Sequence, residues 1–497
     1  MSGLTAGATA FREAYMSADA SDDSDFSSYA ARKMRYLIFW SFFENTAYRN
    51  IHTWSTKFKA DYGLYKYTRA IYNPAHRLGD FWQTHLFGGM LDVKDGVAGD
   101  GGALPIITQD ESLRKAIARL WQDSNWQINK DIVALWGATL GDAVIKVIDD
   151  TEHKQVYLSV VHPATLSEVE RDLRGNVKSY TISETRDDPR GGDRAVTYTE
   201  TAERDGTNVV YRTFLNNDLF AWNNIAAEWF EPYGFIPMVT VQHDNVGLQW
   251  GWSELHAAMS KMREVDDQAS KISDHIRKYV DPAWLVTGVQ KAGTTPAVSH
   301  SASSTARPEP DREEMKMLYG PVGADIKPFV APLDLPGALQ HVANLLSSLE
   351  DDYPELRVEK LRLTGGLTGR AMQLAQQPAE AKVLKRRAGY DDALRRAQQM
   401  AIAIGGWRGY DGYSSFNLAS YKAGKLDHSI GSRAVFQTTK ADRLEEDKLF
   451  WETAQAAYTG GGELGLTKFL QSHGYSDNDV ATVLKSPQFT IAKGTYA

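Results

Sequence analysis

The chain contains no cysteine among its 497 residues. This excludes disulfide frameworks, thiolate metal sites and cysteine nucleophiles, and it is compatible with a reducing cytosol. A surplus of basic charge is also absent, since 55 Lys and Arg stand against 63 Asp and Glu and give a formal net charge of −8. Proteins that grip nucleic acid usually carry a basic surplus. Tight non-specific DNA binding is therefore not expected, whereas weak or repulsive contact with DNA is compatible with this charge.

Long apolar runs are missing as well. The most apolar stretch, residues 36–43, is far too short to span a bilayer. The first 27 residues are rich in Ser, Ala and Asp and have neither the basic start nor the apolar stretch of a secretory signal. We interpret residues 1–27 as a flexible arm and expect no membrane role. The remaining length is enough for roughly three domains of about 150 residues.

No motif for catalysis or metal binding stands out. The patterns G-x-x-x-x-G-K-[ST] and H-E-x-x-H do not occur, and the 12 histidines show no metal-ligand spacing. The segment 251–255 lacks the second glycine of a nucleophile elbow. Gly365, Gly366, Thr368 and Gly369 form a short glycine-rich stretch that could cradle a phosphate before a helix, but a tight turn needing positive φ explains the same glycines. We expect no cofactor, no metal and no catalysis.

The most informative pattern that is present is a pair of segments with heptad spacing. In both, apolar residues alternate three and four positions apart, which keeps a narrow seam facing a neighbouring helix. An ordinary antiparallel hairpin inside a globular core would show the same pattern. The members of this apolar seam are Leu255, Ala258, Met262, Val265, Ala269, Ile272, Ile276 and Tyr279 in the first segment, and Leu339, Val342, Leu346, Leu349 and Tyr353 in the second.

The limits of the two helices are also encoded. Asp281-Pro282 ends the first, because proline lacks a donor and disfavours helical geometry in the residue before it. Asp334 is a cap candidate for the second, and Pro336 suits its first turn. Between them lies an insert with short extended stretches at 283–286, 315–319 and 326–330. The insert is too small to bury a core alone, so it must pack on copies of itself or on the helices.

The segments before the two heptad segments show other spacings of apolar residues. We predict helices in the aromatic-rich segment 28–54, at 110–122 with Asp110 as cap, and at 126–140. Residues 96–105 are expected to be a loop. Alternating segments rich in Val, Thr and Tyr predict an antiparallel meander, with strands at 144–148, 156–161, 177–183, 195–201, 209–214 and 236–241.

After residue 353 we predict a helix to about residue 404, kinked or restarted at Pro378, and further helices at 440–458, 466–472 and 477–484. Two charged features have simple interpretations. The acidic pairs at 149–150 and 187–188 adjoin turn signals and are interpreted as solvated loop residues. The segment 370–396 has a net charge of +4, which a phosphate or an acidic neighbour could use, although a solvated helix face has the same composition. Its basic residues are Arg370, Lys382, Lys385, Arg386, Arg387, Arg395 and Arg396.

Taken together, the order of these parts resembles the portal proteins of tailed bacteriophages. The stretch 363–372, with Gly365-Gly366-Leu367-Thr368-Gly369-Arg370-Ala371, is similar to the family's Ser/Thr-Gly-x-Ala segment after its second stem helix. Asp281-Pro282-Ala283-Trp284 is similar to the family's passage from stem into clip. The resemblance covers most of residues 30–485 and lies mainly in organisation. The Ser/Thr/Pro-rich loop at 294–310 and the aromatic-rich N-terminal segment depart from it.

The resemblance implies an α+β, portal-like subunit. Its wing would be residues 28–250, its stem helices 251–281 and 334–353, and its clip 282–333. A channel loop would follow at 354–369, then a long helix returning to the wing at 370–436 and a helical crown at 437–497. The channel loop would bring mixed charge close to DNA. Its site residues would be Arg357, Lys360, Arg362, Gly365, Gly366, Thr368 and Gly369.

The resemblance also implies partners. Such subunits form a ring, typically a dodecamer, at one capsid vertex, and double-stranded DNA passes through its centre during packaging and ejection. The ring would meet major capsid and scaffolding proteins, the terminase large subunit and head-tail connector (adaptor) proteins. It would assemble in the host bacterial cytoplasm and end in the virion. Two alternatives remain open: a phage DNA-processing enzyme or ATPase using the glycine-rich stretch 365–369, and a coiled-coil scaffold protein.

Overall fold

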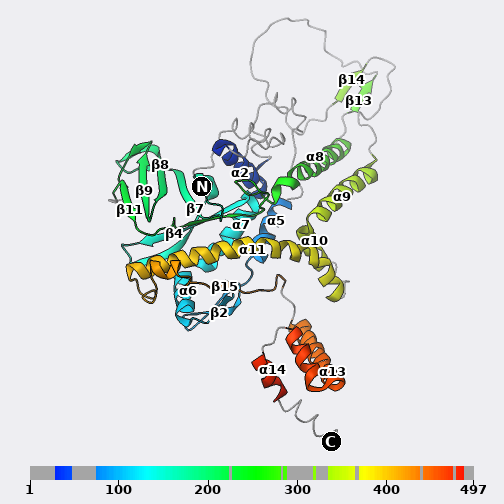
Figure 1. Cartoon of the computed structure of the whole chain (residues 1–497). Coiled ribbons are helices and arrows are strands. Elements are labelled where there is room, and N and C mark those ends of the chain that lie inside the picture. The colour runs from blue at the N-terminus through cyan, green and yellow to red at the C-terminus, as the bar shows by residue number, and fades with distance from the viewer. Residues whose placement is uncertain are drawn as a thin grey trace. The chain divides into compact units, whose positions relative to one another are not determined.

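The computed structural model describes residues 28–47, 74–222, 226–280, 284–287, 317–320, 334–363, 369–436, 440–473 and 477–485. The fold is a mixture of helices and mainly antiparallel sheets, as the α+β prediction requires (Figure 1). The chain divides into two compact units. The larger comprises the described part of Met1–Gly366 together with Leu374–Val435, and the smaller comprises the described part of Leu367–Gln373 and Phe436–Ala497.

A three-stranded sheet with two helices lies in the larger unit. The strands, in the order β12 (Met238–Gln242), β4 (Asp142–Asp150) and β5 (Gln155–Val161), are antiparallel. Helices α6 (Glu111–Asp123) and α7 (Trp126–Leu140) pack on it. The predicted cap is confirmed, because the Asp110 carboxylate accepts from the amides of Ser112 and Leu113.

A six-stranded antiparallel sheet follows. Its order is β10 (Asp218–Leu219), β9 (Asn208–Leu215), β8 (Gly192–Asp205), β7 (Val177–Asp188) and β6 (Leu166–Arg171), and β11 (Glu228–Glu231) also pairs with β9. A single 3-10 turn, Pro163–Thr165, precedes β6. All six predicted strands are present, but they belong to two sheets. The single meander was wrong because β12 returns to pair with β4 across almost a hundred residues.

The expected loop at 96–105 is also wrong. Strand β1 (Leu91–Lys94) and strand β2 (Val97–Gly102) form a hairpin around Asp95 and Gly96, which both have positive φ. Asp-Gly is a strong signal for such a turn. Strand β3 (Ile106–Ile107) then pairs with β15 (Ser429–Ile430), far along the chain.

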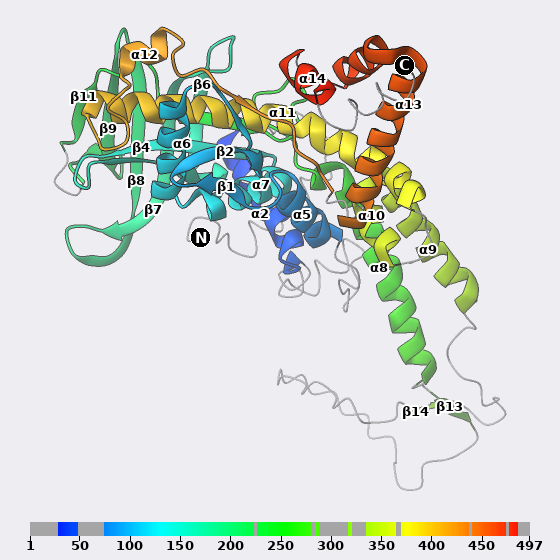
Figure 2. The ribbon, with the colours of Figure 1, turned by 90° about the horizontal axis from the view of Figure 1, so that it is seen from below.

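The two heptad segments form the predicted antiparallel hairpin. Helix α8 (Leu255–Val280) ends directly before Asp281-Pro282, and helix α9 (Leu335–Asp352) begins with Asp334 accepting from the Gly337 amide at 3.2 Å. The helices lie side by side in both ribbon views (Figures 1 and 2), and Lys261 near the start of α8 contacts Asp352 at the end of α9.

In the insert between α8 and α9, strand β13 (Trp284–Thr287) pairs in parallel with β14 (Met317–Gly320). These strands fall on two of the three expected extended stretches. The third, 326–330, lies outside the described residues, as does the Ser/Thr/Pro-rich loop.

The base of the hairpin is part of the core. Helix α2 (Tyr29–Phe43) confirms a helix in the aromatic-rich segment, but it ends at Phe43, before Asn45 with its φ of +60°. Residues 48–54 of that segment lie outside the described residues. Helix α5 (Pro74–His85) packs beside α2. One cluster joins both helices to the hairpin. Its fully or largely buried members are Ile38, Phe39, Phe42, Ala47, Ala75, Leu78, Leu255, Ala258, Met259, Met262, Leu349, Tyr353 and Leu356.

Two predictions after residue 353 need correction. Residues 354–363 are not a loop but helix α10 (Pro354–Leu363), because Leu356 and Val358 bury their side chains in the core. Helix α11 (Gly369–Arg408) continues through Pro378 without interruption, yet it does not extend to 436. It ends at Gly409, which has φ of +71°, as expected for a helix-terminating glycine. Helix α12 (Leu418–Lys422) and β15 complete the segment.

The smaller unit is helical. Helix α13 (Lys440–Ser472) has non-helical geometry at Gly462, so it consists of two helical parts, and α14 (Asp477–Leu484) follows. These helices match the predicted ones. Ala454, Leu466, Leu470 and Val480 form their buried cluster. Within the described residues of the whole chain, no helix is both long and apolar enough to cross a membrane.

Candidate functional site

The apolar seam changes character along the hairpin. Near the base, Leu255 on α8 and Leu349 on α9 are 1% and 0% exposed. Towards the other end, Ile276 is 40% exposed and Leu339 is 52% exposed. Met262 and Val265 are buried, while Ile272, Val342 and Leu346 have intermediate exposure. One end of the seam therefore belongs to the core, and the other leaves apolar surface available to a further helix.

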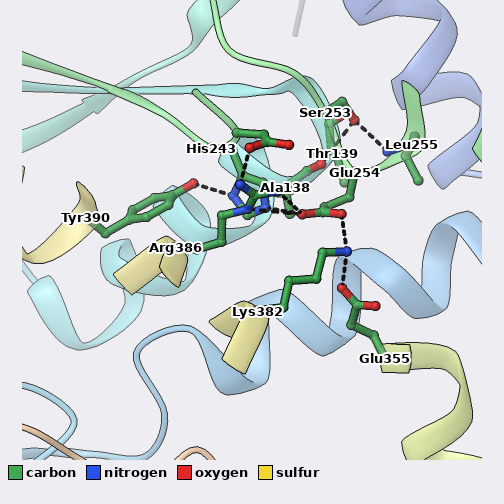
Figure 3. A network of polar contacts seen from close by, with 11 residues as sticks. Ala138, Thr139, His243, Ser253, Glu254, Leu255, Glu355, Lys382, Arg386 and Tyr390 are labelled. Atoms are coloured by element: carbon green, nitrogen blue, oxygen red, sulfur yellow. Dashed lines mark hydrogen bonds and ion pairs between the residues drawn. The ribbon is translucent and has the colours of Figure 1, made fainter. Parts of the chain in front are cut away.

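A network of buried charges lies at the base of the same hairpin (Figure 3). At its centre is Glu254, directly before α8, whose side chain is only 5% exposed. The carboxylate is 3.1 Å from His243 Nε2, 3.1 Å from Arg386 Nη2 and 2.7 Å from Lys382 Nζ. Lys382 is also 2.6 Å from Glu355 Oε1, and Arg386 also contacts Asp244.

Three elements bring these groups together. Lys382, Arg386 and Tyr390 are spaced four residues apart on α11, so they share one helix face. His243 directly follows β12, and Glu355 lies in the first turn of α10. Gly137 on α7 is required here, because a Cβ at that position would lie 1.7 Å from the Tyr390 hydroxyl oxygen.

Hydrogen bonds define the protonation pattern of the network. Burial lowers the pKa of His243, so its imidazole is neutral. A neutral ring that donates from Nε2 to Glu254 must accept at Nδ1, and Tyr390 O–H donates there at 2.8 Å. Burial opposes the ionisation of Glu254, but His243, Lys382 and Arg386 outweigh it and hold its pKa well below the usual range. Glu254 is therefore an anion that two cations, Lys382 and Arg386, balance and that accepts a hydrogen bond from the neutral His243.

The hydroxyl of Ser253, beside the network, connects two helices. The Ser253 hydroxyl lies 2.6 Å from the Thr139 carbonyl oxygen and 3.1 Å from that of Ala138, and it also accepts from the Leu255 amide at 3.0 Å. It therefore fixes the start of α8 to the end of α7. No group of three or more metal-donor side chains occurs among the described residues.

A second buried acid lies beside this junction. Asp142, the first residue of β4, accepts from Tyr36 O–H at 2.6 Å and from the Gly251 amide at 2.9 Å. Arg32 lies nearby, with its guanidinium carbon 3.4 Å from the centre of the Trp250 ring. Burial raises the pKa of Asp142 to about 6, although its hydrogen bonds and the nearby arginines oppose the shift.

This shift predicts a pH dependence of stability. Between pH about 4 and 6 the folded state holds the Asp142 proton more tightly than the unfolded state, so stability falls as pH rises through that window. Asp142→Asn removes this titration and keeps an acceptor for Gly251. On lowering pH from 7 to 4, the wild-type free energy of unfolding should rise relative to the variant by up to ~3 kcal/mol. Urea denaturation at several pH values measures the difference, and parallel curves would contradict the prediction.

The basic segment 370–396 is not an exposed patch. Lys382 and Arg386 belong to the buried network, and Arg387 donates to the carbonyls of Leu86 at 2.7 Å and His85 at 2.8 Å. Arg395 and Arg396 pair with Asp392. Lys382 and Arg386 confirm the acidic neighbour that the sequence left open, but no local signal indicated that this acid, Glu254, would be buried together with them.

The acidic pairs also need a correction. Asp149 is not a solvated loop residue but lies in β4, where Tyr233, Arg408 and Tyr410 donate to its carboxylate, each at 2.7 Å. These bonds fix the end of α11 to the sheet. Asp188 is the last residue of β7 and accepts an exposed hydrogen bond from Arg190, which agrees better with the prediction of a surface residue next to a turn.

The residues predicted for the channel loop are only partly described. Arg357 is exposed on α10 and lies 3.3 Å from Asp351. Lys360 and Arg362 lie on the same helix. Gly365, Gly366 and Thr368 are outside the described residues, while Gly369 is the first residue of α11. The glycine-rich phosphate site suggested as an alternative is therefore not tested by this geometry.

Comparison with protein-family models gives no match for this chain, and comparison with curated proteins gives none either.

Proposed function

We propose that the chain is a portal-type subunit that forms a ring at one capsid vertex, through which phage DNA is packaged and ejected. The observation that carries the proposal is the α8–α9 hairpin. Its base is built into the core, its outer seam residues Ile276 and Leu339 are exposed, and a small β pair is inserted between the two helices. Two helices that share an incomplete seam are suited to packing against further copies of themselves.

In this proposal the hairpin is the stem, β13 and β14 belong to the clip, and the sheets form the wing. Helix α11 returns to the wing, where Arg408 pairs with Asp149 on β4. The smaller unit is the crown. The ring would dock the terminase large subunit and later head-tail connector proteins, besides contacting capsid and scaffolding proteins. No catalytic step is assigned to the chain.

The charge distribution supports a conduit rather than a DNA-gripping protein. The net charge is −8, and five of the seven basic residues of segment 370–396 have partners within the chain. Basic groups that already bind acids or backbone carbonyls of the same chain contribute little to phosphate binding. Passing DNA would then meet weak, salt-screened contacts.

Electron microscopy of the negatively stained, purified protein tests the proposal. We expect closed rings with a central opening, and large particles by light scattering across a range of salt and protein concentrations. Monomers or dimers under all these conditions would contradict the proposal. Turnover of ATP or of a phosphodiester by the same preparation would instead support the enzyme alternative.

A further prediction concerns α10, which replaces the expected channel loop. Substituting Arg357, Lys360 and Arg362 by Ala should leave rings intact but change DNA packaging or retention, because basic groups near the channel modulate a moving polyanion. DNA content and heat-induced DNA release of phage carrying the substitutions measure the effect.

The matched control removes equal charge from the exposed sheet region through Lys94→Ala, Lys154→Ala and Lys178→Ala. Unchanged DNA content and retention in the α10 variant would place these residues on the outside of the ring. The portal proposal itself would survive that result.

A further inference from the structure

The carboxylate of Glu355 is poorly compensated for a buried charge. Its side chain is fully buried, and Lys382 Nζ lies 2.6 Å from Oε1. No hydrogen bond from another residue of the described chain reaches Oε2. A buried carboxylate is costly unless it is both paired and hydrogen-bonded, so Glu355 opposes the packing of the helix that carries it.

Lys382 is the only cation paired with Glu355 in the described chain, and it is shared. Its Nζ lies 2.7 Å from Glu254 Oε2 and 5.1 Å from the centre of the Tyr353 ring, so it stands between two carboxylates (Figure 3). Glu254 does not depend on Lys382, because His243 and Arg386 also bind it. Glu355 has no second cationic partner among the described residues, so its charge is balanced only by a lysine that it shares with Glu254.

Apolar packing holds α10 in place against this cost. Leu356 is 1% exposed and belongs to the cluster at the base of the hairpin, and Val358 is buried as well. Arg77 on α5 donates to the Leu356 carbonyl at 3.1 Å. Glu355, whose buried charge disfavours docking, and Leu356, whose apolar packing favours it, are thus adjacent residues of one short helix.

We propose that α10 exchanges between a state docked on the core and a detached state. The positive charge of Lys382 stabilises the docked state, because it balances the buried Glu355 carboxylate. The carboxylate keeps the docked state close in free energy to a detached one, so changes around Lys382 shift the balance. The inference concerns the single chain and does not require a ring. If the portal proposal holds as well, detachment of α10 would alter the connection between the stem and α11.

The direction in which Glu355→Met changes the docking of α10 distinguishes this arrangement from an ordinary stabilising ion pair. Glu355→Met removes the buried charge at similar volume and leaves Lys382 with Glu254, so α10 should dock more tightly. Lys382→Met leaves Glu355 without its cation and should detach α10. The double variant Glu355→Met/Lys382→Met should restore docking, because replacing both partners with apolar groups avoids the unpaired charge.

Hydrogen exchange of the full-length protein, followed by mass spectrometry, measures these effects on peptides that cover α10. Exchange should become about tenfold faster in Lys382→Met and about tenfold slower in Glu355→Met. In the double variant it should be at or below the wild-type rate. Peptides from β7 and β8 report whether the rest of the unit stays folded. Lys385→Met changes an exposed residue of α11, the helix that also carries Lys382. It is the matched control and should leave hydrogen exchange of α10 unchanged.

Faster exchange in Glu355→Met would overturn the proposal, because the ion pair would then be simply stabilising. Equal α10 exchange in all variants would also overturn it. If Lys382→Met fails to fold, recovery of folding in the double variant supports the proposal and failure of the double variant contradicts it.

Discussion

Replacing Leu339 or Ile276 by aspartate should abolish assembly of the proposed ring while leaving the single chain nearly as stable as before. Both side chains are well exposed in the single chain, so a charge there costs the monomer at most about 0.5 kcal/mol. In a ring the same positions would be buried between helices, where an unpaired charge costs several kcal/mol at every interface. Electron microscopy and thermal unfolding of the same samples separate the two effects.

The expected result differs for Ile272 and Leu346, the seam residues that are only partly exposed. Ile272→Asp and Leu346→Asp should also prevent assembly, but their intermediate exposure means that the monomer loses stability too. Ser347→Asp adds the same charge to α9 beside the seam at an exposed position and is the matched control. Rings of normal size from the Leu339 and Ile276 variants would show that the seam is not an assembly surface.

Removal of Glu254 should have the largest effect on folding. Glu254→Ala would leave His243, Lys382 and Arg386 facing one another without their shared anion, in a site where the acid is 5% exposed. Breaking a buried charge pair by removing one partner costs about 3–5 kcal/mol. Chemical denaturation should therefore show a strongly reduced midpoint.

The control for this prediction is Asp392→Ala on α11, the helix that carries Lys382 and Arg386. Asp392 pairs with Arg395 and Arg396, but its side chain is 47% exposed, so the expected cost is at most about 1 kcal/mol. Similar denaturation midpoints for the two variants would mean that the buried network contributes no more to stability than a surface ion pair does.

Features that depend only on neighbouring residues could be predicted from the amino-acid sequence. Heptad spacing located α8 and α9, and Asp281-Pro282 and Asp334 defined their limits within one or two residues. Alternation located the strands β4, β5, β7, β8, β9 and β12, because side-chain direction along a strand repeats every two residues. Of the candidate site, the seam positions were visible because side chains three and four residues apart share one face of a helix.

Which of these elements pack against one another became known only from the folded chain. Nothing local indicates that β12 leaves the meander to pair with β4, or that Leu356 makes 354–363 a packed helix. The four-residue spacing of Lys382 and Arg386 was readable, but their partner Glu254 lies more than a hundred residues away. Periodicity reports the faces of one element, whereas burial and charge pairing depend on the element opposite. Whether a basic helix face meets water or a buried acid is therefore settled only when the chain is folded.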